Sequence, residues 1–290
     1  MSVNVGGKKT FNEIIELSSQ KALRGGLAGS SAMVLQVTSL MWLRTTMNYQ
    51  YRHGTGLFET IGKLYKEGGV RRFYRGIAPA LFIGPLSRFG DTAANIGALT
   101  FLESNEKTKD LPVFAKTICA STMASLWRIN LMPLDTLKTT LQVEGKKGIP
   151  LLKNKLKIGG PSILYHGSMG AFGATYMGHF PWYYTFNYLN ETLPKYENSL
   201  TKTLLRNAGI GFSASLASDT ISNSMRVIKT SKQSYPEPIS YFDITKLIIK
   251  KDGLIGLMGR GLKTRLLSNG IQGMMFSVLW KLILDLIEKD

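Results

Sequence analysis

The chain has 290 residues, of which 44% are hydrophobic and 19% charged, with a mean hydropathy of zero and a net charge of +17. This balance suits helices that border water on one side, and it excludes a bundle that is apolar all round. A single cysteine, Cys119, excludes a disulfide framework and a thiolate metal site. The positive charge indicates an anionic partner. Because no zinc finger, aromatic RNA-binding motif or basic-zipper heptad accompanies it, we expect an anionic membrane surface and not nucleic acid.

The first third of the chain predicts a long helix from Leu17 to Met47, an amphipathic surface helix from Gly56 to Glu67 and a second long helix from Ile77 to Phe101. Apolar residues recur on one face of the surface helix, and lysines lie off that face. Pro79 falls in the first turn of the second long helix, where its missing N–H costs least.

The other two thirds predict the same order of a long, a short and a long helical segment. In the middle third these are Val113 to Gln142, Leu151 to Lys157 and Ser168 to Leu189. In the last third they are Leu204 to Lys229, Phe242 to Lys250, led in by Ser240, and Leu262 to Ile287.

Two sequence markers recur at a nearly constant spacing. The stretch PLDTLKTTLQ begins at Pro133, and gapless counterparts begin 94 residues earlier at Ser39 and 91 residues later at Ser224. Glycines that follow a basic residue or a histidine recur with the same period, at Gly76, Gly167 and Gly261. Because two independent markers keep one period, we expect one unit repeated three times within a single domain, 1–290, with repeats at about 12–108, 109–198 and 199–290.

The stretch at Pro133 resembles the signature of the mitochondrial carrier family, and the resemblance covers almost the whole chain. It implies an all-α membrane protein with three pseudo-threefold repeats, each made of two transmembrane helices and a matrix helix. It also implies a multi-pass protein of the inner mitochondrial membrane with both termini toward the intermembrane space. The family's helix kinks would fall at Ser39, Pro133 and Ser224.

The same resemblance implies a bound lipid. The starts of the even-numbered helices follow Gly76, Gly167 and Gly261. Because helix N-termini favour phosphate, we expect these starts to bind cardiolipin headgroups.

In the family, the signature acid of each odd-numbered helix pairs with the signature base of the next, which closes the matrix end. The acid positions here hold Met41, Asp135 and Arg226, and the base positions hold Arg44, Lys138 and Lys229. Only the pair of Asp135 with Lys229 can form, whereas Lys138 would face Met41 and Arg44 would face Arg226. The signature glutamines are Gln142 and Gln233.

The remaining charges decide how strong this matrix gate is. One partly buried ion pair at about 4 Å has a Coulomb energy of roughly 4 kcal/mol at an effective dielectric constant near 20, before desolvation. We therefore expect a weak gate, or one neutralised by a bound anion or an anionic lipid. Alternatively, Arg44 and Arg226 point apart. The gate at the opposite end is expected to keep no ion pair. Its paired positions hold Asn95 and Ala98 in repeat one, Asn187 and Asn190 in repeat two, and Lys281 and Leu284 in repeat three.

Two opposite charges are expected on the central axis. Arg128 and Asp219 precede Asp135 and Arg226 by seven residues, two turns back on the same helix face. We expect Arg128 and Asp219 to approach each other, because charges inside a membrane usually face a cavity and pair. They are either substrate or gating residues, or a structural pair that plugs the cavity. Further cavity candidates are Arg88 as an anion anchor, Asp91 as its neutralising neighbour, His179 and Gln272.

Two functions remain open. The first is a solute carrier that moves a small polar or anionic metabolite by alternating access. The second is a non-transporting accessory subunit docked in a large inner-membrane complex such as a respiratory-chain assembly. The weak gates favour the second, because alternating access needs two closed states of similar free energy. The intact signature of the second repeat and the polar axis favour the first, which we place ahead. The sequence offers no nucleophile and base, metal cluster or phosphate loop, so we expect neither an enzyme nor a cofactor.

Overall fold

The computed structural model describes residues 16, 34, 36–194, 196 and 199–272, and within these residues every regular element is a helix. The first helix comprises residues 36–53 and the last helix residues 262–272. Between them lie α2 (Leu57–Phe73), α3 (Ile77–Ser104), α4 (Val113–Asn130), α5 (Met132–Glu144), α6 (Gly148–Gly159), α7 (Ser168–Thr192), α8 (Leu200–Ser234) and α9 (Tyr241–Gly259), with short 3-10 turns at Gly145–Lys147 and Pro161–Tyr165.

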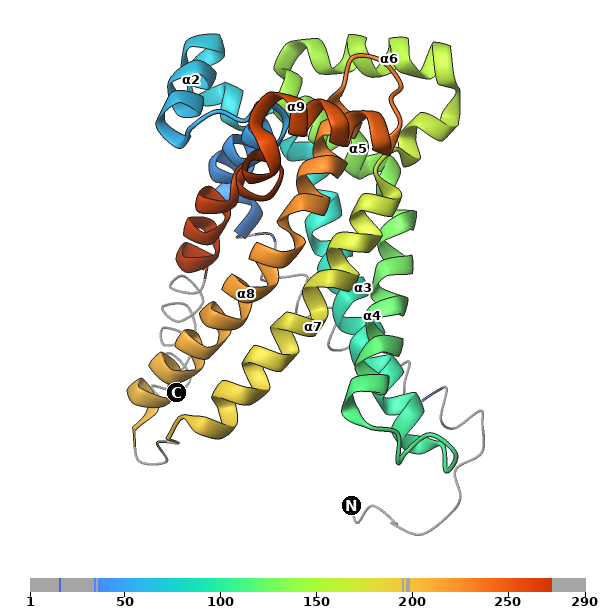
Figure 1. Ribbon diagram of the computed structural model, residues 1–290, viewed down its shortest axis with the longest axis vertical. Coiled ribbons are helices and arrows are strands. Elements are labelled where there is room, and N and C mark those ends of the chain that lie inside the picture. Colours follow the sequence, from blue (N-terminus) through green and yellow to red (C-terminus); the bar gives the residue numbers. More distant parts are fainter. Residues whose placement is uncertain (1–15, 17–33, 35, 195, 197–198, 273–290) are drawn as a thin grey trace, which may run out of the picture.

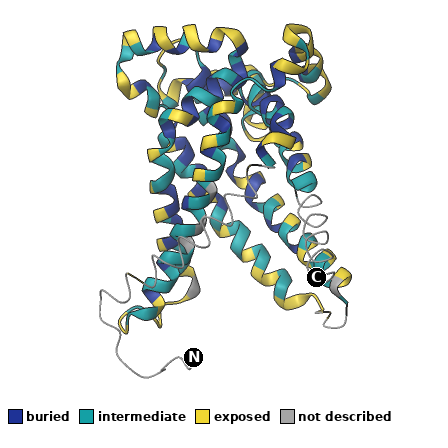
Figure 2. Cartoon of the chain, turned by 180° about the vertical axis from the view of Figure 1, so that it is seen from behind, coloured by how far each residue is buried: buried dark blue, intermediate teal, exposed yellow. Residues whose placement is uncertain are grey.

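The helices are arranged as a bundle with a narrow and a wide end. The surface helices α2, α6 and α9 gather at one end, where the long helices converge, and α7 and α8 diverge from α3 and α4 toward the other end (Figures 1 and 2). The long–short–long order predicted from the sequence is therefore present in the part of the chain that the structure describes. The predicted ends at Leu17 and Ile287 lie outside that part.

In the described residues, no helix combines the length and the apolar character that crossing a membrane requires.

The long helical segment of the middle third is divided into two helices near its proline. The sequence predicted one helix from Val113 to Gln142, and this is wrong: α4 stops at Asn130, and Pro133 sits in the first turn of a new helix, α5. The Asp135 N–H donates to the carbonyl of Leu131 at 3.0 Å, which closes the first turn of α5. A proline N–H is absent there at no cost, because first-turn N–H groups lack helical partners in any case. The helices that contain the other two expected kink positions, Ser39 and Ser224, run through them without a break.

Glycine and serine set the ends of the surface helices. Ser240 caps α9, since its Oγ accepts the N–H of Asp243 at 3.0 Å. Helical geometry in α2 is interrupted at Gly68 and Gly69, and Gly69 has φ +58°, so the predicted end at Glu67 marks a kink and not the last residue of the helix.

The repeated glycines lie at close approaches between repeats. Gly76 has φ +82°, and a Cβ there would lie 3.0 Å from the Lys138 carbonyl oxygen on α5. A Cβ at Gly167 would lie similarly close to α8, and a Cβ at Gly261 would lie close to the first helix. The start of the second long helix of each repeat therefore contacts the first long helix of the next repeat. In the third repeat it contacts the first helix of the chain. The expected binding of lipid headgroups at these glycines stays a prediction.

Buried cations donate hydrogen bonds to the last backbone carbonyls of the first helix, α5 and α8, the long helices that precede the surface helix of each repeat. Arg72 of α2 donates to the Gln142 carbonyl at 2.8 Å, at the end of α5. Lys155 of α6 donates to the Gln233 carbonyl at 3.0 Å, at the end of α8. Arg260, just after α9, donates to a carbonyl at the end of the first helix. Because cations are favoured at helix C-termini, these contacts fasten the surface helices to the narrow end of the bundle.

Candidate functional site

A cavity of about 390 Å³ lies on the axis of the bundle, lined by the first and last helices and by α3, α4, α5, α7 and α8. Among its described lining residues, the basic side chains are Arg44, Arg128, Lys138, Arg226, Lys229 and Arg265. The one carboxylate in the same lining is Asp135. Two more carboxylates, Asp91 and Asp219, contact these cations from neighbouring positions. Six cations against three carboxylates leave this central cavity positively charged.

The ion pair expected at the matrix gate is present. Lys229 Nζ on α8 lies 2.6 Å from Asp135 Oδ2 on α5, and Lys138 Nζ lies 2.6 Å from Asp135 Oδ1. Gln233 supports the pair by donating to Asp135 Oδ2 at 3.2 Å. Lys138 therefore turns to the acid of its own helix, whereas the sequence placed it opposite Met41. The reason is proximity, since residues three apart on a helix lie side by side.

The other signature glutamine joins repeats one and two without charge. Gln142 Oε1 accepts from Asn48 Nδ2 at 2.5 Å, and its Nε2 donates to the sulfur of Met41 at 3.5 Å. Asn48 occupies the first-repeat position that corresponds to Gln142. A hydrogen-bonded amide pair thus joins repeats one and two, which lack the signature ion pair.

Asp219 neutralises the signature arginine of the third repeat. Its Oδ1 lies 2.6 Å from Arg265 Nε and 3.4 Å from Arg226 NH1, and Asn269 donates to its Oδ2. Arg226 also donates to the hydroxyl of Ser222. Arg44 lines the same cavity. The like charges of Arg44 and Arg226 therefore do not face each other uncompensated, because a carboxylate two turns back on α8 binds Arg226.

The expected approach of Arg128 and Asp219 is wrong. Arg128 Nε on α4 donates to Asp91 Oδ1 on α3 at 3.1 Å, so both charges pair with a neighbouring helix and not across the axis. Asp91, which was expected to neutralise Arg88, binds Arg128. The Arg88 side chain lies outside the described residues.

His179 and Gln272 line the central cavity as expected. Gln272 donates to the hydroxyl of Ser268 at 3.3 Å. His179 Nδ1 lies 2.5 Å from Ser121 Oγ, which joins α7 to α4. Neither side chain forms an ion pair in the described structure.

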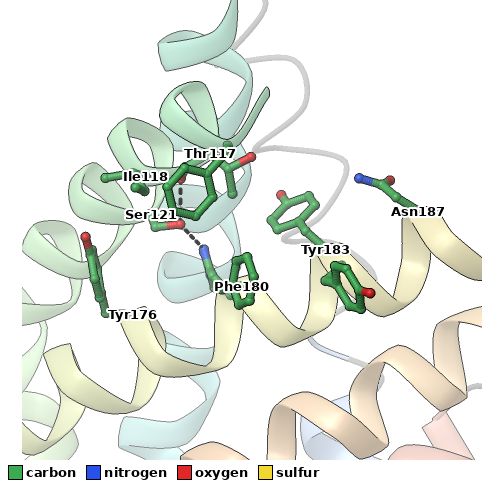
Figure 3. Close-up of a pocket in the computed structure, with 10 residues that line it drawn as sticks. Thr117, Ile118, Ser121, Tyr176, Phe180, Tyr183 and Asn187 are labelled. Carbon is green, nitrogen blue, oxygen red and sulfur yellow. Dashed lines mark hydrogen bonds between the residues drawn. The ribbon is translucent and has the colours of Figure 1, made fainter. Parts of the chain in front are cut away.

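A second cavity, of about 420 Å³, lies between α4 and α7. Ser121 of α4 and Phe180 and Tyr183 of α7 point into the space between the two helices (Figure 3). His179 lines this aromatic cavity as well as the central one. This cavity was not predicted from the sequence. The signal was the recurrence of aromatic residues four apart on α7, which the sequence shows at Phe172, Tyr176, Phe180, Tyr184 and Tyr188.

Comparison with known proteins gives matches to mitochondrial carriers. The family model described as mitochondrial carrier protein matches residues 16–93. The calcium-binding mitochondrial carrier SAL1 of Saccharomyces cerevisiae is 26% identical over 227 residues, which is 69% of this chain and 42% of that protein. The chain is therefore similar to mitochondrial carriers, through residues 16–93 in the family model and over 69% of its length in this relative. It spans less than half the length of this curated relative.

The differences between this chain and the carrier signature are concentrated at the gates. The wide end keeps Asn187 and Asn190 where the family has charges, and Asn190 accepts from Arg206 at 2.9 Å. The corresponding positions of the last repeat lie outside the described residues. Of the three signature ion pairs that would close the narrow end, the chain keeps the one between Asp135 and Lys229.

Proposed function

We propose that this chain is a solute carrier of the inner mitochondrial membrane, which translocates a small polar or anionic metabolite by alternating access. The observation that carries the proposal is the charge of the central cavity, where, among the residues that the structure describes, six basic side chains meet three carboxylates. Charges at such depth in a membrane protein usually mark the path of a substrate or ion. The excess of positive charge favours an anion.

The partial gate fits this mechanism. The Asp135–Lys229 pair holds α5 against α8 at the narrow end, while the neighbouring repeats are joined by the neutral pair of Asn48 and Gln142. A gate with one ion pair needs less ligand binding energy to open than a gate with three, since a ligand shifts an equilibrium only by its differential affinity for the two states.

Uptake into liposomes tests the proposal. The full chain would be reconstituted and screened with labelled dicarboxylates, phosphate and nucleotides, with neutral amino acids for comparison. We expect uptake of at least one anion, reduced about tenfold or more by Arg226→Gln, because a tenfold loss corresponds to about 1.4 kcal/mol of charge interaction. The matched control is Arg71→Gln, which changes an exposed arginine of α2 outside the central cavity and should leave uptake unchanged.

A second candidate function is a non-transporting accessory subunit of a large inner-membrane complex. The observation that favours it is the loss of charged gates, since two of three signature pairs at the narrow end are replaced. The two functions separate in one experiment: an accessory subunit transports no compound of the panel and purifies with a large assembly from mild detergent. In either case, cardiolipin bound at the helix starts after Gly76, Gly167 and Gly261 remains part of the proposal.

A further inference from the structure

The aromatic cavity between α4 and α7 has the size and lining of a ligand site. Its volume of about 420 Å³ lies within the roughly 300–1,000 Å³ of small-molecule pockets. Seven of its ten lining residues are aromatic, aliphatic or histidine. The polar side chains of the lining are Thr117, Ser121 and Asn187. No charged carboxylate or amine occurs among these lining residues, in contrast to the central cavity.

The aromatic rings that form the walls of this cavity contact one another, but more than half of their surface is exposed. Phe114 of α4 meets Phe180 of α7 edge to face, with ring centroids 5.7 Å apart, and Phe180 stacks on Tyr184 at 6.1 Å. Phe114 is 57% exposed, Phe180 56% and Tyr184 63%. Aromatic side chains contribute most when an apolar partner covers their faces. These three rings therefore offer apolar surface that the described chain leaves open.

His179 marks the boundary between the aromatic and the central cavity. It lines both, and its bond to Ser121 Oγ fixes the ring between α7 and α4. On one side of it lie phenyl and phenol rings, and on the other side lies the cavity that contains Arg128. One ligand that reaches past His179 would meet apolar surface at one end and positive charge at the other.

We infer that the ligand of this chain is an amphipathic anion, whose charged group lies in the central cavity and whose apolar part lies in the aromatic cavity. The inference rests on the proposed function and adds the substrate class. The excess of cations in the central cavity selects the negative head, and the uncharged aromatic lining selects a ring or short hydrocarbon chain. A small hydrophilic anion would leave the aromatic cavity unused.

Binding of three related probes to the full chain in lipid nanodiscs tests this inference. The probes are butyrate, 4-phenylbutyrate and the uncharged 4-phenylbutyramide, with empty nanodiscs as the blank for partition into lipid. Since each buried methylene strengthens binding about fourfold, we expect the phenyl group to tighten binding of the anion at least tenfold. The amide should bind at least tenfold more weakly than the phenyl anion.

Variants locate the apolar part. Phe180→Ala should remove most of the phenyl increment and leave butyrate binding unchanged, and Phe114→Ala should act in the same direction from α4. Both side chains are more than half exposed, so folding does not depend on them. Phe82→Ala is the matched control, because Phe82 is 66% exposed on α3 and lines neither cavity.

The outcomes separate the two proposals. If butyrate binds and phenyl adds nothing, or if the phenyl increment survives both Phe180→Ala and Phe114→Ala, the amphipathic ligand is overturned and the anion carrier stands. Equal binding of the amide and the anion would also overturn it, because the aromatic cavity would then hold a neutral lipid-like molecule independently of the charge. If neither butyrate nor 4-phenylbutyrate binds, this inference fails, whereas uptake of a dicarboxylate, phosphate or a nucleotide by liposomes would still support the carrier proposal.

Discussion

Asp135 on α5 and Lys229 on α8 are 2.6 Å apart, with Gln233 and Lys138 bonded to the same carboxylate. The side chain of Asp135 is 10% exposed. The Asp135 carboxylate binds two ammonium groups that would otherwise repel each other. Asp135 therefore contributes more to the closed narrow end than one ion pair would.

Asp135→Asn tests that role. It leaves Lys138 and Lys229 facing each other without their acid, and we expect a loss of about 3 kcal/mol in the free energy of unfolding, the usual cost of breaking a buried pair. Thermal unfolding in one detergent measures it, with the exposed Asp110→Asn as control. Adding Lys229→Gln to Asp135→Asn should recover part of the loss. Additive effects of the two changes would show that the pair does not couple.

Asp219→Asn should have two effects with opposite consequences. It removes the acid that binds Arg226 and Arg265, so we expect stability to fall by about 2–3 kcal/mol, the cost of leaving buried charges without a partner. The loss of this negative charge should also tighten the binding of a small anion such as butyrate. Calorimetry on nanodiscs gives both quantities. Weaker anion binding would indicate that Asp219 positions Arg265 for the ligand.

Arg72→Ala should loosen the surface helix α2. The guanidinium donates to the carbonyls of Gln142 and Val143, and to Glu67 at 2.7 Å. Its removal leaves two carbonyls without this donor, and we expect a loss of about 2–3 kcal/mol. The stability of Arg72→Lys should lie between that of Arg72→Ala and that of the unmodified chain, because one ammonium group cannot reproduce the planar, forked hydrogen bonding of a guanidinium. The neighbouring exposed Arg71→Ala should change stability by less than about 0.5 kcal/mol.

Acid should destabilise the chain through two histidines of the narrow end. Burial lowers the pKa of His53 and that of His166 to about 4 from 6.5. The unfolded chain therefore binds more protons between pH 6.5 and pH 4, so stability is full above pH 6.5 and falls as the pH drops through this window. After discounting for solvent screening, we expect about 1 kcal/mol for each histidine.

The double variant His53→Gln/His166→Gln checks the assignment. Melting temperatures measured from pH 8 to pH 4 should fall less steeply for this variant below pH 6.5 and run parallel to the unmodified chain above it. Identical slopes below pH 6.5 would mean that other groups carry the acid sensitivity.

Gly76→Ala should separate α3 from α5. Its φ of +82° disfavours any side chain, and the added Cβ would lie 3.0 Å from the Lys138 carbonyl oxygen. We expect a loss of about 1–2 kcal/mol from the strained backbone, before the contact is counted. Gly56→Ala is the control, because Gly56 has φ −66° and open space around its Cα. Equal melting temperatures for the two variants would contradict the close approach.

The sequence alone determined the order of helices, the cap at Ser240 and the pairing of Asp135 with Lys229. The first two follow from local or periodic information, because a helix end depends on residues within one turn and the repeat fixes the order of the elements. The pairing of Asp135 with Lys229 is what the resemblance to the carrier family implies for these two signature positions. The break at Pro133 was foreseen as a kink, because proline marks the position but neighbouring helices decide how far the chain turns.

The tertiary structure alone decided the partners of Arg128 and Asp219. Helical spacing shows which face of α4 or α8 carries a charge, but not which neighbouring helix brings an acid or a base nearest to it. Arg128 pairs with Asp91 on α3, and Asp219 pairs with Arg265 on the last helix. Adjacent helices approach more closely than helices on opposite sides of a cavity. The aromatic cavity depends on the divergence of α4 and α7, a property of packing that no single stretch of sequence contains.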